Sequence, residues 1–247
     1  MNKIIRLNKF ISKCGICSRR KADNLIKSGI IKVNNNIITT LGYKININDN
    51  VKYNNKLLNI KNNIYLLFNK PKNCITTLKD NYNRNIIMNY IPKIYKNFGL
   101  FPVGRLDINT TGLLLITNDG KLSKFLTHPR YKIKKKYKIY LNKNFNIKHL
   151  KILKKGIIFK EGKIIIKNLK IFKNNKKILI ITIYIGWNRI IHRIFNKLGY
   201  NILNLNRIYF AGLKLNKSLK LGKYIILNKK KINYIKHINN INYNNEK

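Results

Sequence analysis

Acidic residues are scarce in this sequence. Its 247 residues include 7 Asp and Glu against 53 Lys and Arg, which gives a formal net charge of +46. So few carboxylates argue against an all-carboxylate metal site or a paired-carboxylate hydrolase centre. A surface this basic repels itself unless a polyanion neutralises it, which points to nucleic acid as the partner. Lys, Ile and Asn have AT-rich codons and are overused throughout, so the sign of the charge is more informative than its size.

Cysteines and long apolar runs are also scarce. Three cysteines exclude a disulfide-stapled secreted scaffold. Cys14 and Cys17 are spaced like half of a zinc site, but no second ligand pair lies at the right distance, and the four histidines show no ligand spacing. We therefore expect Cys14 and Cys17 to be buried structural residues. No run of about 18 apolar residues predicts a membrane-spanning helix. The first six residues lack a following apolar stretch, so we expect no signal peptide.

The first part of the chain has the pattern of a small separate unit, residues 1–58. Apolar positions at helical spacing predict two short helices on either side of Gly15. Ser18 is a plausible N-cap of the second helix, and Ser28-Gly29 is a typical end for it. Short strands between Asn-rich turns follow.

The remaining chain has a different character. Residues 59–63 resemble a linker, and residues 64–230 contain strand-like runs with fewer helical ones. Asn174-Asn175 between two of these runs signals a hairpin. The pattern predicts an α+β domain with a large mixed or antiparallel sheet. Residues 231–247 are interpreted as a polar, disordered tail.

One carboxylate differs from the others in its surroundings. Asp107 lies on a loop bounded by Gly104 and Gly112, directly before the apolar run Leu113–Ile116, and Arg105 is two residues away. A carboxylate in this position can be fixed and kept ionised, as a catalytic group requires. The alternative is a loop ion pair that only ties two segments together.

The residues around Asp107 carry a recognisable pattern. Residues 104–120 read GRLDINTTGLLLITNDG, and four other pieces follow the same order and spacing: Asn69-Lys70-Pro71, Leu126–Tyr131, Lys135-Lys136-Tyr137 and Leu205-x-Arg207. Together they resemble the ribosomal small- and large-subunit pseudouridine synthases, and Thr127–Tyr131 is most similar to the large-subunit synthase B branch. Residues 3–58 resemble an S4 RNA-binding domain. The resemblance covers about residues 3–228.

This resemblance implies conversion of a specific uridine in ribosomal RNA, expected in 23S, into pseudouridine. The reaction breaks a C–N glycosidic bond and forms a C–C bond to the same uracil, and it needs no metal or organic cofactor. Asp107 would act as a covalent nucleophile or accept a proton from the sugar. Arg105 is assigned to the same catalytic group. The target base must leave its stack to reach Asp107.

Tyr137 is the expected aromatic platform for the flipped base. On the predicted strand Ile133–Leu141, a period of two places Tyr137 on one face with Lys135 and Ile139. The family carries its active-site tyrosine here. The alternative is a core tyrosine in an amphipathic strand.

Basic residues supply the expected RNA contacts. Four of them cluster on or near the second predicted helix, where they suit phosphate binding, although a merely solvated face is the alternative. Two more basic residues belong to the family motifs in the second unit. The six predicted RNA-binding residues are Arg19, Arg20, Lys21, Lys27, Lys70 and Arg207.

One stretch departs from the family pattern. The family typically has an EGRNRQVRR-like stretch in which one arginine supports the catalytic Asp, whereas residues 185–193 read IGWNRIIHR. His192 aligns with the support position, so we expect Arg193, or with lower preference Arg189, to reach Asp107. The change keeps open a second hypothesis, a homologue that has lost catalysis and persists as an rRNA-binding assembly factor.

Partners and location follow from the same reading. We expect ribosomal RNA, free or in a pre-ribosomal particle, as the partner of a monomer that contacts no membrane. The expected compartment is a bacterial or endosymbiont cytoplasm, with an organellar stroma as the alternative.

Overall fold

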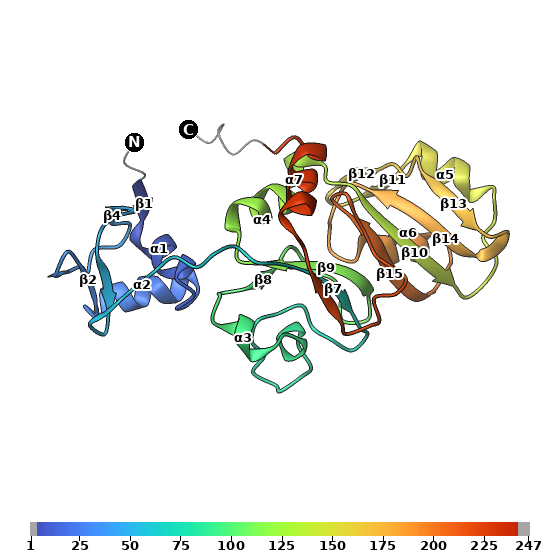
Figure 1. The fold of residues 1–247 in the computed structure, drawn as a ribbon. Helices are drawn as coiled ribbons and strands as arrows, with labels where there is room; N and C mark the ends of the chain where they lie inside the picture. Colours follow the sequence, from blue (N-terminus) through green and yellow to red (C-terminus); the bar gives the residue numbers. More distant parts are fainter. Residues whose placement is uncertain (1–3, 242–247) are drawn as a thin grey trace. The chain divides into compact units, whose positions relative to one another are not determined.

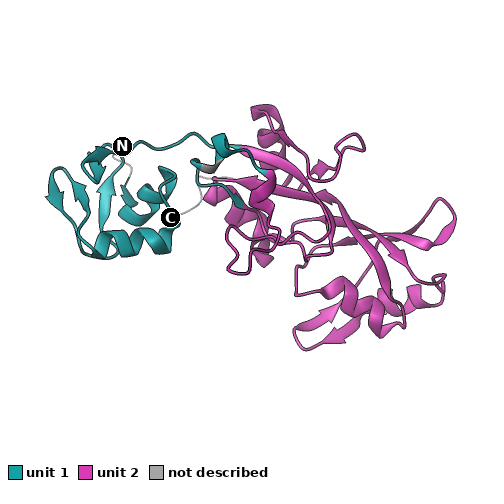
Figure 2. Cartoon of the chain, turned by 90° about the horizontal axis from the view of Figure 1, so that it is seen from below, with its two compact units in different colours: residues 1–64, 91–101 teal, residues 65–90, 102–247 magenta. Residues whose placement is uncertain are grey.

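The computed structural model describes residues 4–241 and divides the chain into two compact units (Figure 2). The first unit contains the N-terminal segment up to Ile64 together with Ile91–Phe101. The second contains Tyr65–Tyr90 and the chain from Pro102 onward. The segment Ile91–Phe101, expected within the second unit, therefore belongs to the first.

The first unit is a small α/β fold around one core. Ser18 caps the second helix by accepting a hydrogen bond from the Lys21 amide at 3.3 Å, and Gly29, at φ +71°, follows the helix end, as the sequence predicts. Gly15, at φ +82°, has no room for a Cβ against the Asn97 carbonyl, which brings Ile91–Phe101 onto the helical pair. The elements of this unit are β1 (Ile4–Arg6), α1 (Leu7–Lys13), α2 (Arg19–Lys27), β2 (Ile31–Val33), β3 (Asn36–Ile37), β4 (Lys44–Asn46), β5 (Val51–Tyr53), β6 (Lys56–Leu57) and α3 (Lys93–Lys96).

The second unit is built on a large mixed sheet (Figure 1). Its main path runs β13-β14-β10-β15-β9-β7-β17, and only the β15–β9 pair on this path is parallel. The predicted α+β fold with a mixed sheet is therefore confirmed. The strands are β7 (Tyr65–Lys70), β8 (Phe101–Pro102), β9 (Thr111–Thr117), β10 (Lys135–Leu141), β11 (Ile157–Phe159), β12 (Gly162–Ile164), β13 (Leu169–Phe172), β14 (Asn175–Ile183), β15 (Ile202–Phe210), β16 (Leu213–Lys214) and β17 (Tyr224–Ile226).

Strand β9 lies at the centre of this unit. All seven of its residues are buried, because β7 and β15 flank it and helices cover it. One core cluster joins β9 to Leu122 and Phe125 of α4 and to Ile232 and Ile235 of α7. The helical segments are η1 (Ile87–Tyr90), α4 (Gly120–Thr127), η2 (Pro129–Tyr131), α5 (His149–Lys155), α6 (Ile190–Lys197) and α7 (Lys229–Ile238).

The expectation of a disordered tail from residue 231 is wrong over the described residues. Asn228 accepts a hydrogen bond from the Lys231 amide at 2.9 Å and caps α7. Ile232 and Ile235 are three residues apart on one face, and both are buried in the core. Apolar burial therefore orders a segment whose overall composition is polar. Residues 242–247 of the predicted tail lie outside the described residues.

Candidate active site

A cleft of about 390 Å³ opens in the second unit beside Asp107. The loop before β9 forms one wall, the faces of β10 and β15 form the floor, and the loop leading into α6 forms another wall. Asp107 is half-buried and is the only carboxylate among the residues that line this cleft. The volume falls in the range of small-ligand sites.

Each of the other described carboxylates already has a structural partner. They bond to a side-chain amide, to a guanidinium, or to backbone N–H groups at a turn or helix start. The five are Asp23 with Asn8, Asp49 with Asn34, Asp80 with Arg84, Asp119 at the N-cap of α4 and Glu161 with Arg193. Asp107, by contrast, forms no ion pair with any described residue, Arg105 included. The loop ion pair considered from the sequence is therefore not formed, and Arg105 is an exposed residue of the cleft wall.

Lys70 is buried beneath the Asp107 loop, so its assignment to RNA binding is wrong. It is 0% exposed, and its Nζ donates to the carbonyl oxygens of Pro71, Ile108 and Thr110 at 3.0, 3.0 and 2.9 Å. Burial lowers the pKa of Lys70 to about 8, although nearby Asp107 favours its charged form. The ammonium fixes the backbone on the C-terminal side of Asp107.

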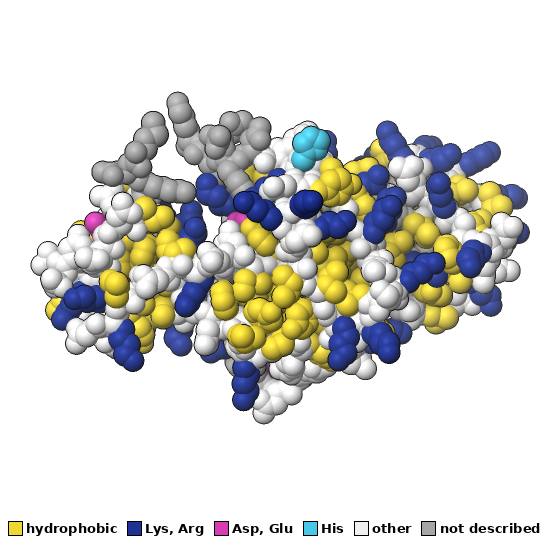
Figure 3. Space-filling view, in the orientation of Figure 1, with side chains coloured by type: hydrophobic (Ala, Val, Ile, Leu, Met, Phe, Trp, Pro, Cys, Tyr) yellow, Lys and Arg dark blue, Asp and Glu magenta, His cyan; other side chains and the backbone are white. Residues whose placement is uncertain are grey.

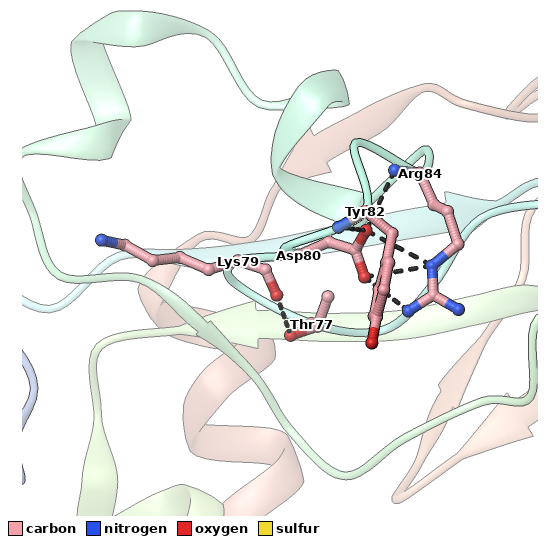
Figure 4. A network of polar contacts seen from close by, with 5 residues as sticks. All are labelled: Thr77, Lys79, Asp80, Tyr82 and Arg84. Carbon is pink, nitrogen blue, oxygen red and sulfur yellow. Dashed lines mark hydrogen bonds and ion pairs between the residues drawn. The ribbon is translucent and has the colours of Figure 1, made fainter.

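A second set of hydrogen bonds fixes the N-terminal side of this loop. The Thr76 hydroxyl donates to the Leu106 carbonyl at 2.8 Å and accepts from the Leu106 amide at 3.3 Å. Thr76 directly precedes Thr77 and the loop drawn in Figure 4, in which the Arg84 side chain lies against Asp80. Hydrogen bonds from Arg84 lower the pKa of Asp80 to about 2. Asp80 therefore has a structural role, within the loop that adjoins the Asp107 segment.

Two bulges in β15 determine which residues face the cleft. Strand β10 pairs Lys136 with Tyr209 and Tyr137 with Arg207, so Ile208 is an extra residue. Without this bulge, Tyr137 would pair with Ile208, and Arg207 would point to the other side. A second bulge leaves Leu203 unpaired. The bulge at Ile208 therefore places Arg207 opposite Tyr137, on the same face of the sheet.

Arg207 is buried, so its predicted role as an RNA contact is also wrong. It is 2% exposed, its Nε donates to the Leu113 carbonyl at 2.7 Å, and its guanidinium lies 4.6 Å from the Phe210 ring centroid. Burial lowers the pKa of Arg207, while a hydrogen bond with Tyr137 opposes this. Its Nη2 is buried without a hydrogen-bond partner. Arg207 is thus a buried part of the cleft floor, next to Tyr137.

Tyr137 is a core residue of its strand that also lines the cleft. Its side chain is 7% exposed and packs in the sheet, yet it lines the cleft with Asp107. Lys135, on the same face, also lines the cleft, and burial lowers its pKa to about 8. The floor is therefore aromatic and cationic.

Arg189, at the N-cap of α6, and His192, in the first turn of that helix, line the cleft in place of Arg193. Arg193 makes a bidentate ion pair with Glu161 at 2.7 and 2.8 Å, so the expectation that it reaches Asp107 is wrong. Arg189, at φ +45°, precedes α6 and lines the cleft with His192. Burial and then the charge of Arg189 lower the pKa of His192, and Asp107 partly offsets this. Neutral His192 therefore dominates at pH 7, and Arg189 is the permanent cation at this wall.

The four basic residues assigned to RNA binding in the first unit lie on α2 and are all exposed. Arg19 also lines a shallow groove with basic residues from β1, α1 and β4. The sequence did not single out these neighbours, because they are far from α2 along the chain. They are Arg6, Lys9 and Lys44. On the molecular face in Figure 3, Lys and Arg are widely spread and Asp and Glu hardly appear.

Cys14 and Cys17 contribute to the packing of the first unit. Cys14 lies in the core of the first unit, where burial raises its pKa to about 12, and Cys17 packs against that core. Within residues 4–241, no cluster of three His, Cys, Asp or Glu is arranged to hold a metal ion. The same part of the chain contains no helix with the length and apolarity to span a membrane.

Comparison with known proteins assigns a family pattern to each of the two units. The S4 domain pattern matches residues 5–51, so the first unit is an S4 domain, joined here to a unit with a carboxylate-bearing cleft. The pattern of the RNA pseudouridylate synthases matches residues 64–197. The chain belongs to the RNA pseudouridylate synthase family and is an enzyme of this class.

Two relatives and one solved structure are similar to this chain over most of its length. The ribosomal large subunit pseudouridine synthase B of Bacillus subtilis is 36% identical, with 85% of this chain and 87% of the relative covered. The protein of the same name from Buchnera aphidicola subsp. Baizongia pistaciae is 36% identical, with 93% and 96% covered. A crystal structure of a pseudouridylate synthase superposes with a TM-score of 0.66 at 27% identity, covering 94% of this chain and 99% of the other.

Proposed function

We propose that this enzyme isomerises one uridine of ribosomal RNA, in the 23S molecule, with Asp107 as the reacting carboxylate. The observation that carries the proposal is the isolation of Asp107. It is the only carboxylate lining the cleft, and among the described carboxylates it is the one that accepts no hydrogen bond and forms no ion pair with a described residue. The names of the similar proteins support ribosomal RNA of the large subunit as substrate.

The cleft residues suit this chemistry. Asp107 must remain anionic in a partly desolvated site, and a permanent cation lowers the cost of that charge. Arg189 supplies this cation, because Arg193 is engaged by Glu161 and His192 is largely neutral. Tyr137 offers a ring on which the extruded uracil stacks, and Arg207 lies opposite it on the neighbouring strand. Asp107 then either attacks C1′ as the N1–C1′ bond breaks and is displaced when uracil C5 attacks the same carbon, or takes a proton from the sugar as uracil leaves and returns it when uracil rejoins through C5. In both routes uracil loses the C5 proton and gains one at N1.

The decisive experiment maps pseudouridines in transcripts of the source organism's 16S and 23S rRNA. Wild-type protein should introduce pseudouridine at a defined 23S position. Asp107→Asn should abolish it while binding the same RNA within a few-fold, since affinity rests on many phosphate contacts. Asp49→Asn, which alters a carboxylate of the S4 domain, is the matched control and should stay active.

Two results would contradict the proposal. Turnover by Asp107→Asn would remove the catalytic assignment. Tight rRNA binding without any protein-dependent pseudouridine would instead favour the assembly-factor hypothesis.

A further inference from the structure

A second pocket adjoins the cleft, and Asp107 lies in the wall that separates the two cavities. It has a volume of about 420 Å³ and lies within the second unit. Asp107, Arg189, His192 and Leu205 line both cavities and form a common wall. Whatever occupies the second pocket therefore lies directly beside the group bound at Asp107.

The side chains found only in the second pocket combine three kinds of chemistry. Lys72 is exposed and forms no ion pair with a described residue, so it is available to an anion. Asn109 and Asn204 are amides, and the Asn204 Oδ1 is buried without a hydrogen-bond partner. Ile108 and Leu203 are 43% and 63% exposed, and both side chains line this pocket. A positive charge, amides and apolar surface together match a nucleotide, with its phosphate, base edge and base face.

The exposure of Leu203 results from the strand geometry. Leu203 is the extra residue of the second β15 bulge, between the Tyr140–Asn204 and Leu141–Ile202 pairs. A bulge redirects the side chain of the unpaired residue, and bulges are common beside active sites. A regular ladder would have given Leu203 a partner on β10. The fold thus presents an aliphatic side chain to the pocket.

We propose that this pocket binds the nucleotide that directly neighbours the target uridine in the same RNA strand. Its phosphate lies between Lys72 and Arg189, its base packs on Leu203 and Ile108, and a base amino group donates to the Asn204 Oδ1. The inference rests on the proposed function, because it takes the cleft to hold the uridine. It makes the neighbouring base a determinant of which uridine is chosen.

Two RNA pentamers test the inference. Each contains one uridine among cytidines, with 2-aminopurine placed directly on its 5′ side in one and on its 3′ side in the other. The protein is the full chain carrying Asp107→Asn, so no turnover occurs, and anisotropy reports binding while 2-aminopurine emission reports its surroundings. We expect the emission to change on saturation for one pentamer only.

Substitutions then connect the signal to the pocket. Leu203→Ala and Asn204→Ala should each weaken pentamer binding about fivefold to tenfold, as loss of one base contact does. Leu221→Ala is the control, because Leu221 is 56% exposed in the same unit and lines neither cavity. Unchanged melting temperatures would show that the variants fold.

The outcomes separate this inference from the proposed function. Unchanged emission from both pentamers at saturation, or affinities of the Leu203 and Asn204 variants equal to that of Leu221→Ala, would overturn the second site. A pentamer signal that depends on Leu203, together with absent pseudouridine in rRNA treated with wild-type protein, would support the second site and refute the proposed function.

Discussion

Replacing Lys70 by Met tests how the fold supports Asp107. The Lys70 ammonium is buried and donates to three backbone carbonyls, two of which follow Asp107 in the chain. Methionine has similar length and no donor. It would leave these carbonyls without their donor, at about 1–3 kcal/mol each. It would also remove the cost of burying the ammonium. The lowering of its pKa from 10.5 to about 8 sets that cost at about 3 kcal/mol. Taking about 6 kcal/mol for the three carbonyls, the net loss of stability is about 3 kcal/mol at pH 7.

The difference in unfolding free energy between wild type and Lys70→Met should depend on pH, and the pKa of Lys70 gives the sign of that dependence. Because the folded state lowers the pKa of Lys70, the unfolded chain binds more protons between about pH 8 and 10.5. Wild-type stability relative to Lys70→Met should therefore increase as the pH rises through this window. Below about pH 8, this additional stability of wild type over Lys70→Met is lost.

Urea unfolding of both proteins from pH 7 to 10.5 measures these differences, and single-turnover kinetics measures the effect on Asp107. We expect the rate to fall about a hundredfold, since small displacements of a reacting group have effects of this size. Lys79→Met, at an exposed lysine of the same unit, is the control. The reasoning would be refuted if Lys70→Met were as stable as Lys79→Met and if the stability difference between Lys70→Met and wild type did not change with pH.

Three further variants test other parts of the site. Tyr137→Phe should keep the rate within about tenfold, whereas Tyr137→Ala should lose about 1–3 kcal/mol of binding and about 3–5 kcal/mol of stability; equal inactivity of both by single-turnover assay would contradict a stacking role. Arg189→Gln should reduce the rate more than His192→Gln, and the wild-type rate should not decline across pH 7, because His192 is already neutral there. A rate that declines across pH 7, with His192→Gln the more severe, would assign the charge to the histidine. Joint alanine substitution on α2 should lower the log–log salt slope of RNA binding by about 3, measured by anisotropy, and an unchanged slope would mean that these charges are only solvated. The substituted residues are Arg19, Arg20, Lys21 and Lys27.

Local patterns predicted the central part of the fold. The apolar run Leu113–Ile116 became β9, and the alternation around Tyr137 became the face of β10 that lines the cleft. The position of Asp107 at the start of β9 also followed from adjacent residues. These features depend on neighbours within a few positions, which a sequence displays directly.

The errors have a common physical origin, contacts between distant segments. Lys70 was taken as a surface cation because nothing near it in sequence shows the carbonyls of residues 108 and 110 that surround its ammonium. Arg193 was assigned to Asp107, but its partner Glu161 lies 32 residues earlier. Arg207 was assigned to RNA from the family motif, and strict alternation does not reveal the bulge at Ile208 that determines which way its side chain faces. For α7, the cap at Asn228 and the spaced isoleucines were a usable signal that composition obscured.

The two bulges of β15 also determine where this strand tolerates a change of length. Deletion of Leu203 or Ile208 would leave every other residue opposite its present partner on β10, because neither has a partner there. Deletion of Asn206 would instead turn Leu205 away from the cleft and bring Asn204 onto that face. Ile208 is therefore the position at which the strand can lose a residue and keep the face that lines the cleft, whereas loss of Leu203 would keep the register but remove an aliphatic side chain from the second pocket.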